Sequence, residues 1–320
     1  MSAGAARVAV VGLGAIGREV VKAVRARPSL ELAGAFDPAF VGRDVGEVAE
    51  LGPLGVKAAS TLAAALSGAD VALVLTLSGV AEMIPVVEAA GAAGVDVVST
   101  CEDLAYADLG TAALAQQIDA RARATGITVV GTGVNPGLVM DRLPLTLAAA
   151  CVRVDRVRVT RVVDAAKRRA PLRAKVGAGL TVEEFEAGVA AKKLGHRGLP
   201  ESCALVGLGL GFTFDEIRST IGPVTEPRPG VDAGRVAGLR QSAVGLRGGD
   251  ELVRLDLEMS VGAPDPRDRV VIEGDPPLDV LVAGGTHGDR ATVGTVLNAI
   301  PSVIAAAPGL LTVLDLTLRR

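Results

Sequence analysis

The glycine-rich segment near the start of the chain constrains the fold more than any other feature. Residues 7–17 read Arg-Val-Ala-Val-Val-Gly-Leu-Gly-Ala-Ile-Gly, so an apolar run is followed by Gly12, Gly14 and Gly17. Asp37 comes twenty residues after Gly17, at the end of a second apolar run. This order of strand, glycine turn, helix, strand and acid is typical of a dinucleotide-binding βαβ unit.

Each glycine of this fingerprint has a physical task. Gly12 permits a tight turn, Gly14 lets the backbone approach a pyrophosphate, and Gly17 lets the helix pack closely on the strand. The next helix, expected at about 15–27, offers the N–H groups of its first turn to the phosphates. The alternative is a glycine-rich turn that binds no ligand. The residues expected to contact a cofactor here are Gly12, Gly14, Ala15, Ile16 and Gly17.

The sequence leaves the choice between NAD and NADP open. Asp37 would accept hydrogen bonds from the adenosine ribose and repel a 2′-phosphate, which slightly favours NAD. Arg43 follows six residues later and could reach a 2′-phosphate.

Composition excludes several classes of protein. The net charge is −3 and no basic stripe is present, so no nucleic-acid partner is expected. The three cysteines lie far apart without a CxxC pair, which indicates reduced thiols in a cytoplasmic protein. No signal peptide and no apolar stretch of membrane-spanning length is visible, so no membrane partner is expected. Neither histidine has a carboxylate at metal-ligand spacing, and no metal is expected.

Alternating strands and helices over residues 1–135 predict an α/β fold, an N-terminal Rossmann domain with a doubly wound parallel sheet. Residues 286–320 are expected to return to this domain and pack on it as a C-terminal helix. Asp289 could cap that helix, and Pro308 and Gly309 would stop it near residue 307. Strands are expected at 8–11, 32–36, 71–75, 95–99 and 127–130, and the longer helices at 80–93 and 107–125.

Residues 136–285 predict a second, α+β domain with an open mixed sheet, for substrate binding and oligomerisation. Residues 152–163 and 252–261 alternate between apolar and charged side chains, as half-exposed strands do. Thr181 and Glu184 form a capping box that opens a helix to about residue 194. The exposed alternation leads us to expect a homodimer formed through the open sheet. Two more strands are expected at 270–273 and 278–283, and a surface segment at 221–238.

Polar residues follow the predicted parallel strands, where ligands of such folds bind. Thr76 could touch the cofactor ribose or phosphates, although a plain loop explains it equally well. Glu102 follows the fourth strand, and a carboxylate beside an apolar pocket is suited to general base catalysis. The alternative is that Glu102 or Asp103 only caps the next helix. Cys101 is expected to be a buried thiol, and Asn135 could hydrogen-bond the nicotinamide carboxamide or the substrate, or serve only as a turn residue.

The second region offers further pocket candidates. Asp164 precedes a cationic cluster at 167–169 that could anchor a charged substrate or form a solvated face. His287 and Thr286 lie in a glycine-rich turn and could face the same cleft. A histidine in such a turn is more often a structural hydrogen bonder, and the same holds for His196.

Several of these segments together resemble the 2,4-diaminopentanoate dehydrogenases and the native amine dehydrogenases related to them. Both groups have the dihydrodipicolinate reductase-like two-domain fold, and the resemblance covers nearly the whole chain. The segments that carry it are Gly131–Gly137, Val163–Arg169, Thr220–Val224, Gly284–Thr292 and Asn298–Pro301.

The resemblance implies a reversible oxidative deamination, in which an amine and NAD(P)⁺ give a ketone or aldehyde, ammonia and NAD(P)H. The family uses a glutamate after the fourth strand to handle the protons of ammonia and the carbinolamine, and that position is Glu102 here. Asn135 becomes an expected pocket residue. If the substrate carries a second amine, Asp164 is the candidate acid for it.

Two departures refine the expectation. The chain has no His-His pair of the kind that true dihydrodipicolinate reductases use for their dicarboxylate. Aromatic residues are scarce, which favours a small aliphatic amine or carbonyl. Two alternatives stay open: another NAD(P)-dependent reductase of the same fold, such as a semialdehyde or hydroxy dehydrogenase, and a non-catalytic nucleotide-binding protein. The aromatic candidates for the pocket are Tyr106, Phe185, Phe212 and Phe214.

Overall fold

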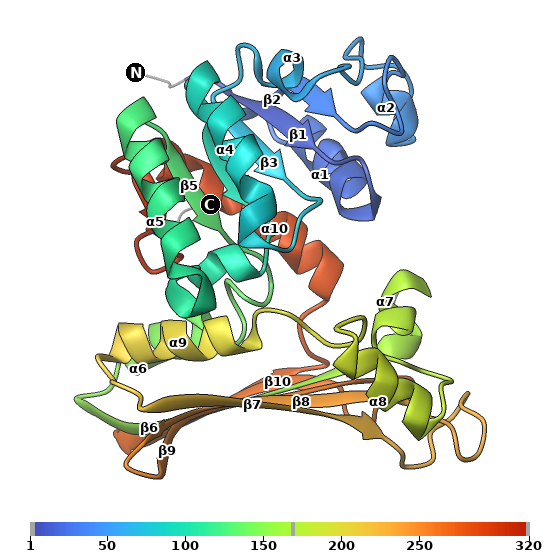
Figure 1. Ribbon diagram of the computed structural model, residues 1–320, viewed down its shortest axis with the longest axis vertical. Helices are drawn as coiled ribbons and strands as arrows, with labels where there is room; N and C mark the ends of the chain where they lie inside the picture. Colours follow the sequence, from blue (N-terminus) through green and yellow to red (C-terminus); the bar gives the residue numbers. More distant parts are fainter. Residues whose placement is uncertain (1–3, 168–169, 318–320) are drawn as a thin grey trace. The chain divides into compact units, whose positions relative to one another are not determined.

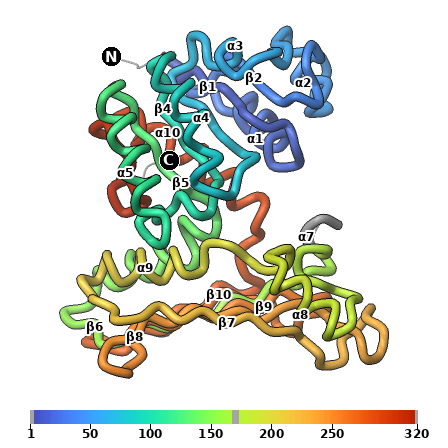
Figure 2. The backbone as a smooth tube through the Cα atoms, viewed as in Figure 1, coloured from blue at the N-terminus to red at the C-terminus, as the bar shows by residue number. Residues whose placement is uncertain are grey.

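The computed structural model describes residues 4–167 and 170–317. The chain divides into two compact units (Figures 1 and 2). Unit 1 comprises the residues up to 138 together with those from 287 onward, and unit 2 comprises residues 139–286. The chain therefore passes between the units twice.

Unit 1 contains, among its described residues, a sheet of six parallel strands in the order β12-β5-β4-β3-β1-β2. This confirms the predicted Rossmann-type class. The central strands are continuous apolar runs, since helices cover both faces of a parallel sheet; β3, for example, is buried at all of its residues. The strands are β1 (Ala6–Val11), β2 (Leu30–Phe36), β3 (Val71–Val74), β4 (Asp96–Ser99), β5 (Thr128–Gly131) and β12 (Gly309–Leu311).

Two hydrophobic clusters lie on the two faces of this sheet. One joins α1 and α10 to residues of β1 and β3, and the other joins α4 and α5 to the opposite side of the same strands. The helix predicted at 107–125 is interrupted, because Leu109, Gly110 and Thr111 have non-helical backbone angles. The helical segments are α1 (Ala15–Arg25), α2 (Val45–Val48), α3 (Leu62–Leu66), α4 (Val80–Ala93), η1 (Asp103–Tyr106), α5 (Asp108–Thr125) and α10 (Gly288–Ile304).

The C-terminal segment contains a helix close to the one predicted up to about residue 307, and also a strand that the sequence did not predict. Helix α10 ends at Ile304, and the chain then adds β12 beside β5 at the edge of the sheet. The backbone N–H of Leu310 donates to Oδ1 of Asp119 at 2.9 Å, which fixes this short strand to α5. The predicted cap is also corrected, because His287 rather than Asp289 is the N-cap of α10.

Unit 2 is built on a mixed sheet in the order β11-β10-β6-β9-β8-β7, as its open α+β prediction required. Among the described strands of this sheet, only β6 and β9 pair in parallel. Helices α6, α8 and α9 lie over one face of this sheet (Figure 1). The strands are β6 (Arg153–Asp164), β7 (Glu216–Val224), β8 (Gly238–Arg247), β9 (Asp250–Ser260), β10 (Arg267–Asp275) and β11 (Leu278–Ala283).

The helical segments of unit 2 are η2 (Ala165–Lys167), α6 (Arg142–Ala148), α7 (Ala170–Lys175), α8 (Val182–Ala190) and α9 (Leu199–Leu210). The capping box of α8 is present, since the Thr181 side chain accepts from the N–H of Glu184 and the Thr181 N–H donates to that glutamate. No described helix is long and apolar enough to cross a membrane.

The surface segment predicted at 221–238 is corrected in part, because its first residues belong to β7. Strand β8 and helix α9 were not predicted from the sequence. Helix α9 is apolar around most of its circumference and contains glycine, so the amphipathic period that reveals surface helices is missing.

Candidate active site

In the glycine turn after β1, packing within the protein requires glycine at positions 12 and 17 but not at position 14. Gly12 has φ +100°, and a Cβ there would lie 2.1 Å from Cγ2 of Thr76. A Cβ on Gly17 would lie 1.9 Å from the carbonyl oxygen of Gly12. Gly14, in contrast, has φ −66°, and a Cβ there would meet nothing within 4 Å. Its bare backbone therefore borders open space, as an approaching pyrophosphate needs.

The first turn of α1 is arranged to receive an anion. Within the described chain no side chain caps this helix, and its first turn contains no acid. The first intrahelical hydrogen bond runs from the N–H of Arg18 to the oxygen of Gly14 at 3.0 Å. The N–H groups of Ala15, Ile16 and Gly17 precede it, at the positive end of the helix dipole.

Asp37 lies directly after β2 and is held against the glycine turn. Its Oδ2 accepts from the N–H of Leu13 at 2.8 Å, and its Oδ1 accepts from the N–H of Ala39 at 2.9 Å. Each carboxylate oxygen can accept a second hydrogen bond, so ribose hydroxyls can still be bound.

Arg43 extends the same end of the site. Its guanidinium lies 5.5 Å from the centre of the Phe40 ring, an aromatic face that attracts cations. Among the residues that the structure describes, no carboxylate pairs with Arg43, whose side chain is exposed. The cation is therefore available to an anionic ligand.

Hydrogen bonds join the loops that follow β3, β4 and β5. The N–H of Asp103 donates to the oxygen of Ser78 at 3.3 Å, and the N–H of Thr132 donates to the oxygen of Ser99 at 2.8 Å. Three neighbouring strand ends are thus tied together at the edge of the sheet where ligands of such folds bind. Thr76, in the first of these loops, is exposed.

Glu102 follows β4 and immediately precedes η1. This short helix packs so closely on the end of β5 that a Cβ on Gly131 would lie 2.6 Å from the backbone nitrogen of Ala105. The Glu102 side chain makes no capping hydrogen bond to η1, although it occupies the N-cap position, so Glu102 itself does not act as the cap. The residue is half-buried and its Oε2 atom is buried. A partly desolvated carboxylate beside a ligand site is typical of a proton-transfer group.

Cys101 precedes Glu102 in the same loop, and Asn135 lies in the loop after β5. Cys101 is 1 % exposed, and burial raises the pKa of its thiol to about 12, which removes it as a nucleophile at neutral pH. Asn135 is 8 % exposed, and its bond to Pro136 is cis. Gly137, at φ +125°, turns the loop back on itself.

The other predicted pocket residues make structural contacts. Oδ1 of Asp164 accepts from the N–H groups of Ala166 and Gly262 at 2.9 and 3.0 Å. His287 is exposed, and its Nδ1 accepts from the N–H of Arg290 at 3.4 Å. Arg168 and Arg169 of the predicted cationic cluster lie outside the described residues. The backbone groups of His196 hydrogen-bond the amide of Gln241.

His287 also lines a cavity in unit 1. The cavity has a volume of about 520 Å³ and lies between α1 and the first turns of α10. Among the described residues, no group of three or more His, Cys, Asp or Glu side chains is placed to hold a metal ion. The residues that line the cavity are Glu19, Lys22, Ala23, His287, Asp289, Arg290 and Val293.

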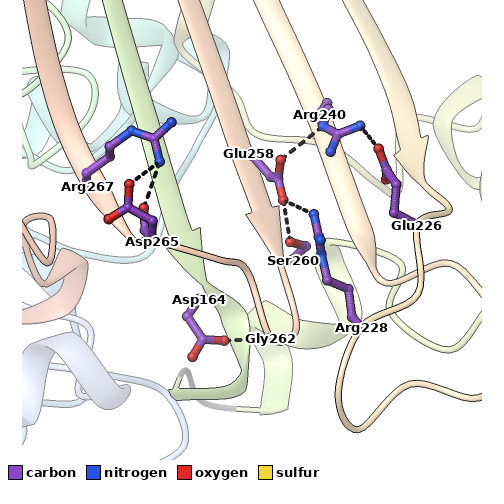
Figure 3. A network of polar contacts seen from close by, with 9 residues as sticks. All are labelled: Asp164, Glu226, Arg228, Arg240, Glu258, Ser260, Gly262, Asp265 and Arg267. Atoms are coloured by element: carbon purple, nitrogen blue, oxygen red, sulfur yellow. Dashed lines mark hydrogen bonds and ion pairs between the residues drawn. The ribbon is translucent and has the colours of Figure 1, made fainter.

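Unit 2 contains a polar network that sequence reasoning missed (Figure 3). Glu258 on β9 accepts hydrogen bonds from Arg228 at 3.1 Å, Arg240 at 3.0 Å and Ser260 at 2.8 Å. Burial opposes the charge of Glu258, but these three donors hold its pKa below the usual value. Glu226 also pairs with Arg240. Because these charges neutralise one another, the network fits a structural role.

A second set of polar residues is buried more deeply. Arg161 on β6 pairs with Asp268 on β10, and their side chains are 5 % and 1 % exposed. Asp141 and Ser202 are both fully buried and joined by a hydrogen bond of 2.7 Å. An acid at an inward position of an alternating strand was the available signal for Asp268.

The family models cover most of the chain. Residues 138–320 match the model described as 2,4-diaminopentanoate dehydrogenase C-terminal domain, and residues 6–122 match that described as dihydrodipicolinate reductase, N-terminus.

Individual relatives agree with these matches. The 2,4-diaminopentanoate dehydrogenase of Acetoanaerobium sticklandii is 31 % identical over 238 residues, covering 71 % of this chain and 67 % of the relative. An amine dehydrogenase of Streptomyces virginiae is 28 % identical and covers 97 % of this chain and 96 % of its own length. The solved amine dehydrogenase of Mycobacterium smegmatis is 25 % identical, with a TM-score of 0.85 over 98 % of this chain and 97 % of that one. The chain therefore belongs to the family of 2,4-diaminopentanoate dehydrogenases and amine dehydrogenases, which are NAD(P)-dependent oxidoreductases.

Proposed function

We propose that the protein catalyses the reversible oxidative deamination of a small aliphatic amine, with Glu102 as the proton-transfer group. One observation carries the proposal. A half-buried carboxylate with a buried oxygen lies at the carboxyl end of β4, in the sheet whose first turn carries the glycine fingerprint. The names of the family's relatives supply the reaction class.

The chain's residues fit a nicotinamide cofactor. The bare backbone at Gly14 and the uncapped start of α1 suit the pyrophosphate, and Asp37 suits the adenosine ribose. When bound, this cofactor supplies or accepts a hydride. NAD is slightly favoured by Asp37, while Arg43 allows NADP as well. We propose that Thr76 and Asn135 complete the cofactor contacts, in the loops after β3 and β5.

In the reductive direction, Glu102 takes part in two proton transfers. Its carboxylate takes a proton from ammonium, and the neutral nitrogen adds to the carbonyl carbon to form a carbinolamine. The protonated carboxyl then returns a proton to the hydroxyl group, which leaves as water. The carboxylate that remains stabilises the iminium cation. Hydride transfer to the iminium carbon then gives the amine.

The scarcity of aromatic side chains supports a small aliphatic substrate. Phe185 is 1 % exposed and fills the core beside Gly177. Phe214 packs where Gly207 and Gly245 leave room for its ring. These two rings are committed to packing in unit 2, so few aromatic surfaces remain to bind an aromatic amine. Asp164, Thr286 and His287 stay candidates for the pocket.

The test is NADH oxidation with a panel of aliphatic ketones and aldehydes, with and without ammonium. We expect turnover that depends on ammonium. Glu102→Gln should lower kcat by about 10²- to 10⁴-fold, the usual contribution of general acid–base catalysis, with an unchanged dissociation constant for NADH. Asp103→Asn, at the adjacent acid, is the matched control.

Three outcomes would contradict the proposal. Turnover without ammonium would indicate a reductase of another substrate class. Cofactor binding without any turnover would indicate a non-catalytic nucleotide-binding protein. Near-normal activity of Glu102→Gln would be compatible with the proposed reaction but would refute the role of Glu102 as its proton-transfer group.

We further propose a cytoplasmic homodimer that associates through the open face of the unit 2 sheet. On that face β10 and β11 place Leu281 beside Arg269, and the Leu281 side chain is 56 % exposed. Light scattering tests the proposal, and a monomeric mass would contradict it.

A further inference from the structure

We infer that Arg161 and Asp268 are positioning residues that fix the peptide of Thr286, where the chain passes from unit 2 back to unit 1. Oδ2 of Asp268 accepts from the N–H of Thr286 at 2.7 Å, and Nη2 of Arg161 donates to the Thr286 oxygen at 2.9 Å. Nη1 of Arg161 donates to Oδ1 of Asp268 at 2.8 Å and closes the ring. We call these three residues the Thr286 clamp.

The burial of the clamp indicates that it fixes the position of the backbone at Thr286. A buried ion pair rarely adds net stability over well-packed apolar side chains, because both charges lose their hydration. Asp268 faces the covered side of β10, in line with the buried Val270 and Ile272, where an apolar residue would pack well. What apolar side chains cannot do is hold both the N–H and the C=O of one peptide segment, as the guanidinium and carboxylate do here.

The chain crosses from unit 2 to unit 1 between Thr286 and His287, directly after the clamp. Thr286 is held within unit 2, and His287 is already the N-cap of α10 in unit 1. Only the link between these two residues separates the clamp from the helix. Gly284 and Gly285 have φ +76° and +69°, but they precede the clamp, so their conformational freedom does not reach the crossing.

The other crossing, between Leu138 and Val139, has a similar anchor. Asp141 is fully buried, and its Oδ2 accepts from the hydroxyl of Ser202 on α9 at 2.7 Å. Its Oδ1 accepts from the N–H of Arg142, the first residue of α6, at 2.6 Å. A buried carboxylate of unit 2 therefore holds the chain close to each crossing.

The consequence for catalysis rests on the proposed function, in which unit 1 binds the cofactor and Thr286 is a candidate for the substrate pocket. The rate of hydride transfer then depends on how closely the clamp fixes Thr286. A misplacement of about 1 Å can cost roughly 100-fold in rate. Loosening the clamp should therefore lower kcat without changing the cofactor affinity of unit 1.

The experiment compares Arg161→Lys and Asp268→Asn with a matched Arg–Asp pair on β6, the strand that carries Arg161. Arg161→Lys keeps the positive charge but loses the planar guanidinium, whose two Nη atoms contact Asp268 and Thr286. Asp268→Asn keeps the shape of the side chain but loses its negative charge. The controls are Arg153→Lys and Asp155→Asn, an ion pair on β6 whose side chains are 66 % and 51 % exposed.

Three measurements are made on each variant: hydrogen exchange of the peptide covering residues 284–288, the dissociation constant of NADH, and kcat with NADH and NADH deuterated at C4. In the clamp variants we expect faster exchange, an NADH affinity within about twofold of wild type, and a kcat lowered by roughly 10- to 100-fold. The isotope effect on kcat should rise as hydride transfer becomes limiting. The controls should match the wild type.

If hydrogen exchange of residues 284–288 is unchanged in the clamp variants, Arg161 and Asp268 do not hold Thr286. If exchange is faster but kcat is unchanged, the two residues hold Thr286 but have no positioning role in catalysis. Loss of NADH binding in parallel with kcat would also overturn that role, because it would indicate general destabilisation. If the wild type reduces no carbonyl compound, the proposed function fails, and the exchange measurement alone still decides whether the clamp holds Thr286.

Discussion

Replacing Gly14 by alanine separates cofactor binding from folding. A Cβ at Gly14 would meet no atom within 4 Å, and φ is −66°, which alanine adopts freely. We expect the stability of the cofactor-free protein to change by no more than about 1 kcal/mol, since loss of unfolded-state entropy offsets the weaker N-cap. The melting temperature should then shift by at most about 4 °C.

The matched control is Gly17→Ala. Its Cβ would lie 1.9 Å from the Gly12 oxygen, so the turn or the helix must move. Overpacking of this kind costs about 1–3 kcal/mol or more. Gly17→Ala should therefore lower the melting temperature of the cofactor-free protein by about 2 °C or more, and by more than Gly14→Ala does.

The assay is thermal unfolding with and without NADH. At 100 times its dissociation constant, a ligand stabilises by about 2.7 kcal/mol, or roughly 5–11 °C here. If the new methyl group weakens binding tenfold, the same concentration stabilises Gly14→Ala by only about 1.4 kcal/mol, or roughly 3–6 °C. Equal NADH-induced shifts in Gly14→Ala and wild type would refute the argument that a pyrophosphate lies against Gly14.

Two further predictions concern the segment after β2. Arg43→Ala should raise the KM for NADPH about tenfold or more, because a charge-assisted phosphate contact is lost, and should leave the KM for NADH nearly unchanged; equal effects on both would contradict a role at the 2′-phosphate. Asp44 accepts backbone N–H groups from Leu54, Gly55 and Gly46, which hold its pKa below the ordinary 3.8. A lowered folded-state pKa contributes stability above pH 3.8 that is lost as the pH falls through the folded value. The difference in urea midpoint between wild type and Asp44→Asn should therefore shrink between pH 6 and pH 3, and a difference independent of pH would contradict this assignment.

Much of unit 1 could be predicted because its signals are local. The βαβ fingerprint at residues 7–17 needs each glycine for a turn or a close approach within a few residues. Buried parallel strands such as β3 are continuous apolar runs. The capping box at Thr181 is likewise contained in four consecutive residues. These features depend on backbone geometry that neighbouring residues set by themselves.

The rest depends on contacts between distant residues. Strand β12 has three residues and exists because β5 and Asp119 hold it. Helix α9 shows no amphipathic period, because it is buried around most of its circumference. The clamp joins Arg161, Asp268 and Thr286, and no local pattern relates these positions.

By itself, the sequence determined a dinucleotide-binding turn, the succession of parallel strands and a carboxylate after the fourth of them. Tertiary structure decided what surrounds that carboxylate: η1 packs on Gly131, leaving Glu102 half-buried and without a capping bond to that helix. It also decided that His287 caps α10 and that a buried ion pair holds the residue before it. The physical reason is that burial and charge pairing are properties of the packed chain, whereas turn geometry and strand propensity belong to its neighbouring residues.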